Sequence, residues 1–267
     1  MVERNTFSDG TLYCGWAIHA QRYEFAARYC VDQRVFDAGC GIGYGSHLLS
    51  RHGATEVYGV DYSAEAITEA RQTYPTDKLH FIEGNLEDLD AVEGLPGTFD
   101  VLVNIENLEH LFHPTQFLDA AVARLQSSGR VQAIITTPNG ALTERDKSGR
   151  IRNEFHVREY RETEFSELVG QYFENHDLFG QWDRPESYAR LDRERRLFEQ
   201  LSGFYYNPLL RLGRLVTRGL GRTPPPPPRF TAAGETYPWE YEIQPLADAP
   251  FPWQPKYLIA VCRGPKS

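Results

Sequence analysis

The sequence predicts an α/β fold with a doubly wound, mostly parallel sheet of seven strands. Short apolar runs alternate with longer segments of helical periodicity over residues 34–181, as expected when parallel strands are joined by helices. A glycine-rich turn separates the first apolar run from the helical segment that follows it. The last apolar run, at 255–263, comes more than seventy residues after the one before it. We therefore expect a regular α/β core with an insertion before its last strand.

The expected elements follow one another in a regular order. A helix is expected over 12–29, where small and aromatic residues recur at helical spacing. Ser63 is expected to cap the third helix, because a serine side chain can accept a hydrogen bond from the first turn. The strands are expected at 34–38, 56–61, 79–83, 99–104, 130–139, 173–181 and 255–263, and the helices between them at 43–52, 64–71, 114–125 and 161–171.

The chain is expected to divide into four parts. Residues 1–32 would form a loose arm and a lid helix, 33–181 the core, 182–254 an insertion and 255–267 the final strand of the core. The insertion contains a charged helix (185–201), an aromatic patch (204–208), a basic helix (208–220) and five prolines at 224–228. Polyproline is stiff and extended, so the prolines are interpreted as a spacer. The inserted helices would either cover the active site or contact a partner.

Composition excludes several classes of protein. The formal net charge of the 267 residues is −9, which disfavours a polyanionic substrate held through its phosphates, and no nucleic-acid partner is expected. No stretch approaches the ~20 apolar residues that span a bilayer, and the first residues lack a signal-peptide pattern. We therefore expect a soluble, cytoplasmic protein without a membrane partner. Its four cysteines lack metal-type spacing and are expected to be free thiols.

The stretch from Val35 to Gly45 predicts a nucleotide-binding turn. An apolar strand leads to Asp37, and Gly39, Gly41 and Gly43 follow before the next helix. Glycines let the backbone approach a ligand closely, and the helix N-terminus lies at the same place. The dinucleotide fingerprint has a wider second gap, and an acid beside the turn would repel phosphate. A ligand with a cationic or amino-bearing group fits this turn better than a dinucleotide.

The turn D-x-G-x-G-x-G, with the later V-Y-G-V-D-Y ending at Asp61 and Tyr62, resembles the class I S-adenosylmethionine-dependent methyltransferases, which have a Rossmann-like fold. The resemblance implies S-adenosylmethionine as the cofactor and Asp61 as the acid that bonds its ribose hydroxyls. It also implies an adenine position at Asn85 and Leu86. Arg22 or a tyrosine of the first helix would hold the methionine carboxylate, unless that helix simply packs on the sheet. The residues assigned to the cofactor are Arg22, Asp37, Gly39, Gly41, Gly43, Asp61, Tyr62, Asn85, Leu86 and Asn104.

A second cluster follows the fourth strand. Glu106, Glu109 and His110 have the spacing of residues on one face of a helical turn, at the strand end where ligands bind. His156 follows the fifth strand and is expected on the same side of the sheet. Four such side chains could hold a divalent metal. Magnesium prefers oxygen ligands, so manganese, iron and zinc stay open beside magnesium.

The Glu-x-x-Glu-His pattern with a later histidine resembles the plant small-RNA 2′-O-methyltransferases, and a similar pattern occurs in ubiquinone-pathway O-methyltransferases. The first resemblance implies that Glu106, Glu109, His110 and His156 bind magnesium and, through it, a vicinal diol. A bound metal lowers the pKa of a hydroxyl. Without metal, His110 or His156 would act as a general base beside Glu109. A purely structural cluster is the third alternative.

The acceptor is expected to be a small molecule or carbohydrate. The blocks around His19 and His156 resemble a subgroup of bacterial methyltransferases of glycan and glycosylated natural-product pathways, which implies O-methylation of a sugar-like hydroxyl. N-methylation of an amino sugar or another small amine, without metal, is the alternative. A catalytically silent partner that assembles through the proline-rich insertion is a third hypothesis. RNA methylation is disfavoured by the net charge.

Overall fold

The computed structural model describes residues 12–126, 130–183, 241–248 and 254–266. The chain divides into two compact units, and the first comprises residues 1–4, 18–182 and 243–267. The second comprises 5–17 and 183–242, of which only a few residues are described. The expected arm at 1–10 and the expected helices, aromatic patch and prolines over 185–228 lie outside the described residues. Everything below concerns the first unit, apart from the bounds of elements that cross between the two.

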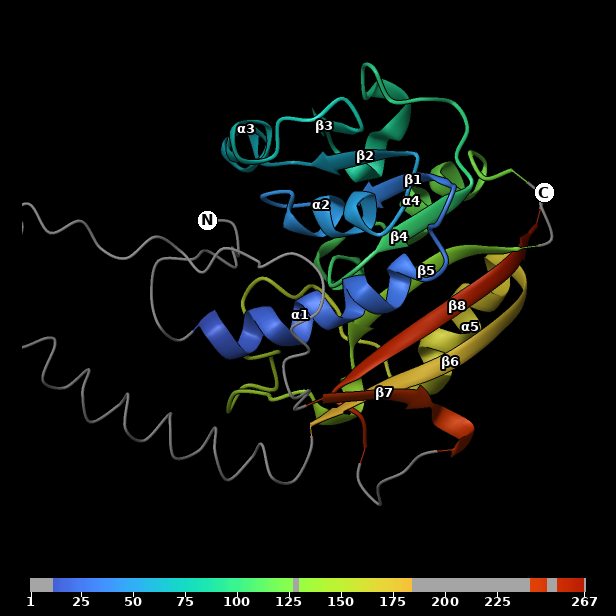
Figure 1. Cartoon of the computed structure of the whole chain (residues 1–267). Helices are drawn as coiled ribbons and strands as arrows, with labels where there is room; N and C mark the ends of the chain where they lie inside the picture. The colour runs from blue at the N-terminus through green and yellow to red at the C-terminus, as the bar shows by residue number, and fades with distance from the viewer. Residues whose placement is uncertain (1–11, 127–129, 184–240, 249–253, 267) are drawn as a thin grey trace, which may run out of the picture. The chain divides into compact units, whose positions relative to one another are not determined.

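The first unit is built on one mixed sheet whose strand order is β3-β2-β1-β4-β5-β8-β6-β7 (Figure 1). The pairs from β3 to β5 are parallel, whereas β8 is antiparallel to both β5 and β6. The strands are β1 Arg34–Ala38, β2 Glu56–Asp61, β3 Leu79–Glu83, β4 Val101–Asn104, β5 Val131–Pro138, β6 Phe173–Asp183, β7 Tyr241–Pro245 and β8 Tyr257–Pro265. The doubly wound, mostly parallel arrangement was therefore predicted correctly.

The number of strands was wrong by one. The eighth strand, β7, lies beside β6 at the edge of the sheet, within the stretch that was assigned to the insertion. It has only five residues and ends at a proline, and its described side chains are half-buried. Its sequence, Y-E-I-Q-P, alternates apolar and polar residues over only four positions before the proline, which is too short to predict a strand with assurance.

The helices match the expected order. They are α1 Leu12–Ala27, α2 Tyr44–Arg51, α3 Ala64–Thr73, α4 Pro114–Val122 and α5 Glu162–Tyr172, with short 3₁₀ turns η1 Leu86–Ala91, η2 Leu108–His110, η3 Gly140–Leu142 and η4 Leu246–Asp248. The Ser63 hydroxyl caps α3 by accepting a hydrogen bond from the Ala66 amide at 3.2 Å. At α5 the Glu164 carboxylate reaches back to accept from the Arg161 amide at 2.9 Å.

Apolar side chains on both faces of the sheet hold the helices against it. In Figure 1, α1 and α2 lie in front of the sheet, and α4 and α5 lie behind it. Phe36 of β1 and Phe99, just before β4, are fully buried and stack with ring centroids 5.2 Å apart. Cys30, Cys40 and Cys262 are free and buried, as expected. This packing fixes where the parallel strands end, and those ends carry the candidate site.

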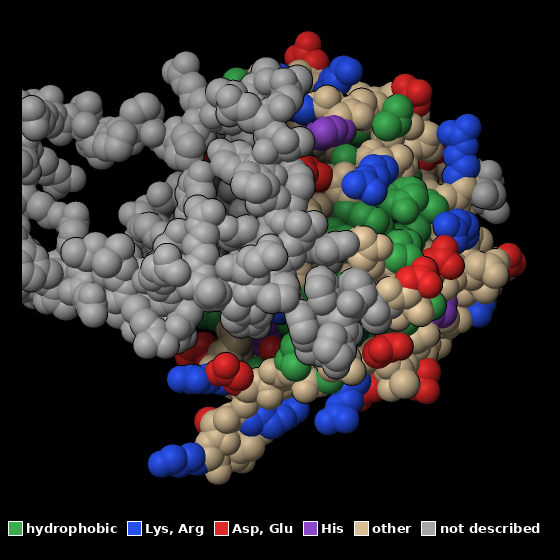
Figure 2. Space-filling view, turned by 60° about the horizontal axis from the view of Figure 1, so that its bottom comes forward, with side chains coloured by type: hydrophobic (Ala, Val, Ile, Leu, Met, Phe, Trp, Pro, Cys, Tyr) green, Lys and Arg blue, Asp and Glu red, His purple; other side chains and the backbone are tan. Residues whose placement is uncertain are grey.

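Two further observations bear on partners. On the face shown in Figure 2, the described basic side chains lie interspersed with acidic ones, unlike the continuous basic surface typical of proteins that bind phosphate backbones. Among the described helices, none is long and apolar enough to span a bilayer.

Candidate active site

The glycine turn after β1 opens one side of its backbone to a ligand. Gly39, Gly41 and Gly43 have positive φ angles of 82°, 53° and 83°. A Cβ at Gly39 would meet Asn107 at 2.6 Å, and one at Gly43 would meet the Phe81 ring at 2.6 Å. A Cβ at Gly41 would meet no atom within 4 Å. The outer glycines thus allow close packing, whereas Gly41 borders open space in front of α2.

Asp37 is a fully buried carboxylate directly before this turn. It accepts hydrogen bonds from the Tyr23 hydroxyl at 3.0 Å and from the Ser46 hydroxyl at 2.5 Å. Burial raises its pKa to about 7, although both hydrogen bonds act to lower it. Asp37 therefore sits where a nearby positive charge would shift it toward the ionised form.

The end of β2 supports the predicted ribose position. Asp61 accepts hydrogen bonds from the Gly41 amide at 2.8 Å and from the Ser63 amide at 2.9 Å, which aim its carboxylate toward the glycine turn. Tyr62 is 75% exposed, so its ring is available to a ligand. After β3, Leu86 is buried, and the exposed Asn85 side chain accepts from the Glu87 amide at 3.0 Å. The predicted adenine residues therefore form an ordinary capped turn.

Arg22 of α1 is buried against charged and aromatic partners. Its Nη1 donates to Gln181 Oε1 at 2.6 Å, and its guanidinium lies 3.9 Å from the centre of the Tyr257 ring. Its Nη2 lies 3.7 Å from Glu106 Oε2, while its Nε has no hydrogen-bond partner among the described residues. Arg22 is thus a buried cation with one unsatisfied donor, and an anionic ligand group would satisfy that donor.

Asn104 ends β4 and has a similar unsatisfied atom. Its side-chain amide donates to the Ala38 carbonyl at 3.0 Å, which ties β4 to the start of the glycine turn. Its Oδ1 is buried without a hydrogen-bond partner among the described residues. A buried acceptor without a donor is costly, so this atom marks a position where a ligand or water would bind.

Three of the four predicted metal ligands come together beyond β4 and β5. Ligand atoms of Glu109, His110 and His156 all lie within 4.8 Å of one another. The Glu109 side chain is only 1% exposed, and its Oε1 lies 3.9 Å from His110 Nε2. The two imidazole rings meet edge to face, with centroids 5.0 Å apart. The cluster is therefore compact and partly buried.

The expectation that Glu106 shares a helical face with Glu109 and His110 was wrong. Glu106 has a φ of 50°, and only the 3₁₀ turn η2 follows it, so the expected helical turn does not form. Its carboxylate accepts from the Thr136 hydroxyl at 2.9 Å and faces Arg22. Burial raises the pKa of Glu106 despite these partners. Glu106 lies outside the group of three and nearer the buried arginine.

Sequence reasoning missed the residue that orients His156. Glu159 Oε1 lies 2.5 Å from His156 Nδ1, and Glu159 Oε2 accepts from the Thr143 hydroxyl at 2.5 Å. Burial raises the pKa of Glu159, but the hydrogen bonds from His156 and Thr143 outweigh it and lower that pKa below its usual range. The H-V-R-E-Y block contained the signal, since a carboxylate three residues after a histidine can reach its ring.

The two histidines share one orientation. His110 Nδ1 lies 3.0 Å from the Phe155 carbonyl, an acceptor, so this nitrogen carries the proton. His156 Nδ1 likewise faces the Glu159 carboxylate. Both Nε2 atoms are therefore the acceptor nitrogens, and that of His156 accepts a hydrogen bond from Asn153 Nδ2 at 2.9 Å. An imidazole nitrogen fixed in this way can bind a metal or accept a proton, which at His156 requires the Asn153 amide to turn away.

Comparison with known proteins relates part of the chain to methyltransferases. Residues 36–133 match the family described as "Methyltransferase domain". The chain is 31% identical over 163 residues to a probable S-adenosylmethionine-dependent methyltransferase of Mycolicibacterium smegmatis, covering 61% of this chain and 60% of that protein. It is 37% identical over 111 residues to a mitochondrial ubiquinone biosynthesis O-methyltransferase of Schizosaccharomyces pombe, covering 40% and 39% of the two chains. The chain thus spans about half the length of the curated relatives it matches.

A solved structure supports the fold. The MccD protein aligns with a TM-score of 0.51 at 13% identity, and the alignment covers 64% of this chain and 79% of that one. The glycine turn and Asp61 lie within the part that matches the family, together with the Glu109–His110 pair. Residues 36–133 are therefore similar to a methyltransferase domain, and the matched relatives from Mycolicibacterium and Mycobacterium are named as probable S-adenosylmethionine-dependent methyltransferases.

Proposed function

We propose that the chain transfers a methyl group from S-adenosylmethionine to a hydroxyl of a small molecule, most specifically a sugar or glycosylated compound, with a divalent metal held beside the acceptor. The observation that carries this proposal is the compact group of Glu109, His110 and His156 at the ends of β4 and β5. Its place in the fold is the carboxyl edge of the parallel strands, where ligands of this fold bind.

The cofactor fits residues on three strand ends. Gly41 borders open space in front of the α2 N-terminus, which suits the methionine part of the cofactor. Asp37 would stabilise its positive charge, and Arg22 has a spare donor for its carboxylate. Asp61 would accept from the ribose hydroxyls, Tyr62 would pack on the adenine ring, and Asn85 and Leu86 would border it.

The group of three also fits a divalent ion. A buried carboxylate and two imidazole nitrogens form a mixed oxygen and nitrogen set, which suits manganese, iron or zinc as well as magnesium. When bound, such an ion would lower the pKa of a coordinated hydroxyl. Glu159 would hold His156 in the tautomer that presents Nε2. In the absence of metal, the same nitrogen would serve as the general base.

The hydroxyl acceptor is supported by chemistry and by the relatives. A carboxylate and two fixed imidazoles suit an acceptor that must lose a proton, which a hydroxyl does and a neutral amine does only after attack. One group of matched relatives carries a name that fits, since the ubiquinone biosynthesis proteins are O-methyltransferases by name. The choice of a sugar rests on the weaker resemblance of the His19 and His156 blocks to glycan-pathway enzymes.

Metal content and product chemistry test the proposal together. The protein would be purified and analysed for manganese, magnesium, iron and zinc with the demethylated cofactor product present, beside Glu109→Ala and, as a control acid outside the site, the exposed Glu93→Ala. We expect roughly one metal per chain, lost in Glu109→Ala and kept in Glu93→Ala. No affinity for the cofactor product would refute the function. Cofactor binding without metal, and an N-methyl product insensitive to chelator, would leave a metal-free N-methyltransferase.

A further inference from the structure

A hairpin with three arginines lies between β5 and α5, before the histidine of the proposed site. Residues 144–152 pair as antiparallel chain, with the Asp146 amide donating to the Arg150 carbonyl at 2.9 Å and the Arg152 amide to the Glu144 carbonyl at 2.8 Å. Asp146 Oδ1 closes the turn by accepting from the Ser148 and Arg150 amides at 2.8 and 3.0 Å. The hairpin is thus a formed structure rather than an irregular loop.

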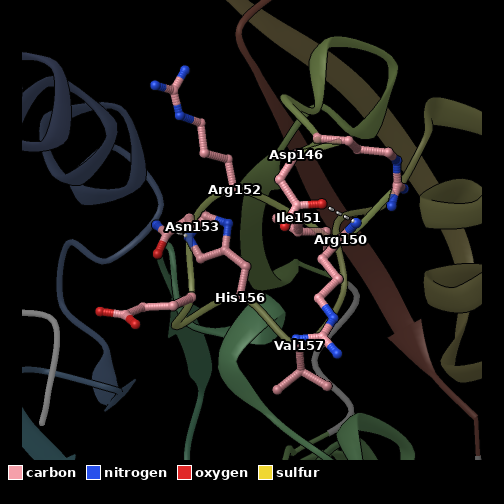
Figure 3. Close-up of a pocket in the computed structure, with 9 residues that line it drawn as sticks. Asp146, Arg150, Ile151, Arg152, Asn153, His156 and Val157 are labelled. Atoms are coloured by element: carbon pink, nitrogen blue, oxygen red, sulfur yellow. Dashed lines mark hydrogen bonds between the residues drawn. The ribbon is translucent and has the colours of Figure 1, made fainter. Parts of the chain in front are cut away.

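The hairpin borders a pocket that reaches the candidate site. Its volume is about 620 Å³, and its lining includes Arg145, Arg150, Asn153, His156 and Val157. Figure 3 shows the His156 ring beside Asn153 and the Arg150 side chain extending toward Val157. The Arg152 side chain extends in a different direction, away from Val157. Since His156 lines the pocket and belongs to the group with Glu109 and His110, a molecule in the pocket would reach the proposed reacting hydroxyl position.

The charges around this pocket are not all balanced. Arg152 pairs with Glu144 at 2.7 Å, and the Asp146 carboxylate is taken up by the donors of its turn. Arg145 Nη1 donates to the Gly149 carbonyl at 3.0 Å, and its positive charge also helps to lower the pKa of Glu159. The Glu154 carboxylate lines the pocket as well. The exposed Arg150 guanidinium has no ion-pair partner among the described residues, so it is the lining cation best placed to take an anionic ligand group.

We propose that this pocket binds an anionic group, a phosphate or a carboxylate, carried by the acceptor itself, with Arg150 as its principal partner and Arg145 in support. The proposal rests on the proposed function, since it names the class of acceptor at that site. A guanidinium group presents paired donors that match phosphate and carboxylate oxygens. The acceptor is then a sugar phosphate, nucleotide sugar or uronic acid whose hydroxyl faces His156. The pocket volume is within the range of small-molecule sites.

Binding of simple anions tests the pocket without knowledge of the acceptor. Inorganic phosphate and glucuronate would be titrated into ¹⁵N-labelled protein saturated with demethylated cofactor product, with glucose as the neutral control. The signals to follow are the backbone amides of residues 144–153. We expect saturable shifts with phosphate, glucuronate or both, and none with glucose. Phosphate alone would assign a phosphorylated acceptor, and glucuronate alone a uronic acid.

Matched variants separate the pocket from general charge. Arg150→Gln removes the principal partner, whereas Lys147→Gln removes one positive charge from the same hairpin outside the pocket lining. Both side chains are exposed, so both variants should fold, and equal melting temperatures would verify this. We expect the anion Kd to rise about tenfold in Arg150→Gln, since a charged hydrogen-bonded contact is worth about that much, and to stay within about twofold in Lys147→Gln.

Two results would overturn the inference: no saturable anion binding, or equal weakening by both variants. Activity assays then separate it from the proposed function. Methylation of neutral sugars that Arg150→Gln leaves unchanged would keep the function and remove the anionic acceptor. Saturable, Arg150-dependent anion binding without methyl transfer to any hydroxyl would keep the anion site and remove the proposed reaction.

Discussion

Replacing Asp37 by asparagine should change the pH dependence of folding in a definite direction. The Asp37 carboxyl group is fully buried, and burial raises its pKa from 3.8 to about 7. An acid with a raised pKa binds its proton more tightly in the folded state than in the unfolded state. Its contribution to stability is therefore fully present below pH 3.8 and is lost as the pH rises to about 7. Asparagine cannot titrate, so the variant should lack this loss.

The size of the effect follows from the two pKa values. A rise of about 3 units corresponds to about 4 kcal/mol over the whole titration, at 1.36 kcal/mol per unit. Between pH 5 and pH 8 the wild-type protein should lose about 2–3 kcal/mol that the variant does not lose. The pKa of about 7 already includes the opposing effect of the hydrogen bonds from Tyr23 and Ser46.

Urea denaturation of the cofactor-free protein measures the difference. The free energy of unfolding would be determined at pH 5, 6, 7 and 8 for wild type, Asp37→Asn and the control Asp90→Asn. The Asp90 carboxylate is 87% exposed on a surface pair with Arg124, so its variant should follow the wild type. The variant-minus-wild-type difference for Asp37→Asn should grow steadily with pH. A constant difference across that range would show that Asp37 titrates normally and that burial does not control its pKa.

Three further changes test other parts of the structure. Gly43→Ala should lower the free energy of unfolding in urea titrations by about 2–4 kcal/mol, because the strained backbone adds to overpacking against Phe81. The control Gly94→Ala, at a φ of 82° in open space, should cost only about 1 kcal/mol. Equal losses in the two variants would contradict the packing argument. Ser63→Ala should cost about 1 kcal/mol by removing the α3 cap, and a melting temperature equal to wild type would contradict that role. Glu159→Ala should weaken metal binding or methyl transfer by about 10–100-fold, and Glu159→Gln should weaken it less. Cofactor affinity should be unchanged in both Glu159 variants. Equal losses of cofactor affinity in the two variants would indicate a structural role.

The sequence was most informative where local chemistry alone decides the structure. The glycine spacing after β1 predicted a tight turn, and the three glycines of that turn have positive φ angles. Ser63 was recognisable as a cap because the serine side chain and the first turn of α3 are neighbours in sequence. The succession of strands and helices along the chain followed from the alternation of apolar runs and helical segments. The glycine turn and the cap each depend on residues within a few positions of one another, and the alternation can be recognised without knowledge of any long-range contact.

Features that depend on distant partners were missed or misjudged. β7 is an edge strand beside β6, and the alternation in its five residues is too short to predict a strand by itself. The pairing of Arg22 with Gln181 joins residues 159 positions apart. The Glu159 carboxylate also accepts a hydrogen bond from Thr143, sixteen positions earlier in the connection between β5 and α5. No periodicity within a short window can predict such contacts, because they exist only after the strands have assembled.

Glu106 shows how one backbone angle can change the interpretation of a cluster. The i, i+3, i+4 spacing predicts a shared face only if all the residues are helical, and a φ of 50° at Glu106 removes that condition. Its carboxylate then faces Arg22 and Thr136, near the residues proposed for the cofactor, while Glu109 and His110 face His156. A pattern that suggested four ligands of one metal is therefore better explained as two neighbouring functions. Glu106 would hold the cofactor-side arginine, and the remaining three residues would serve the acceptor.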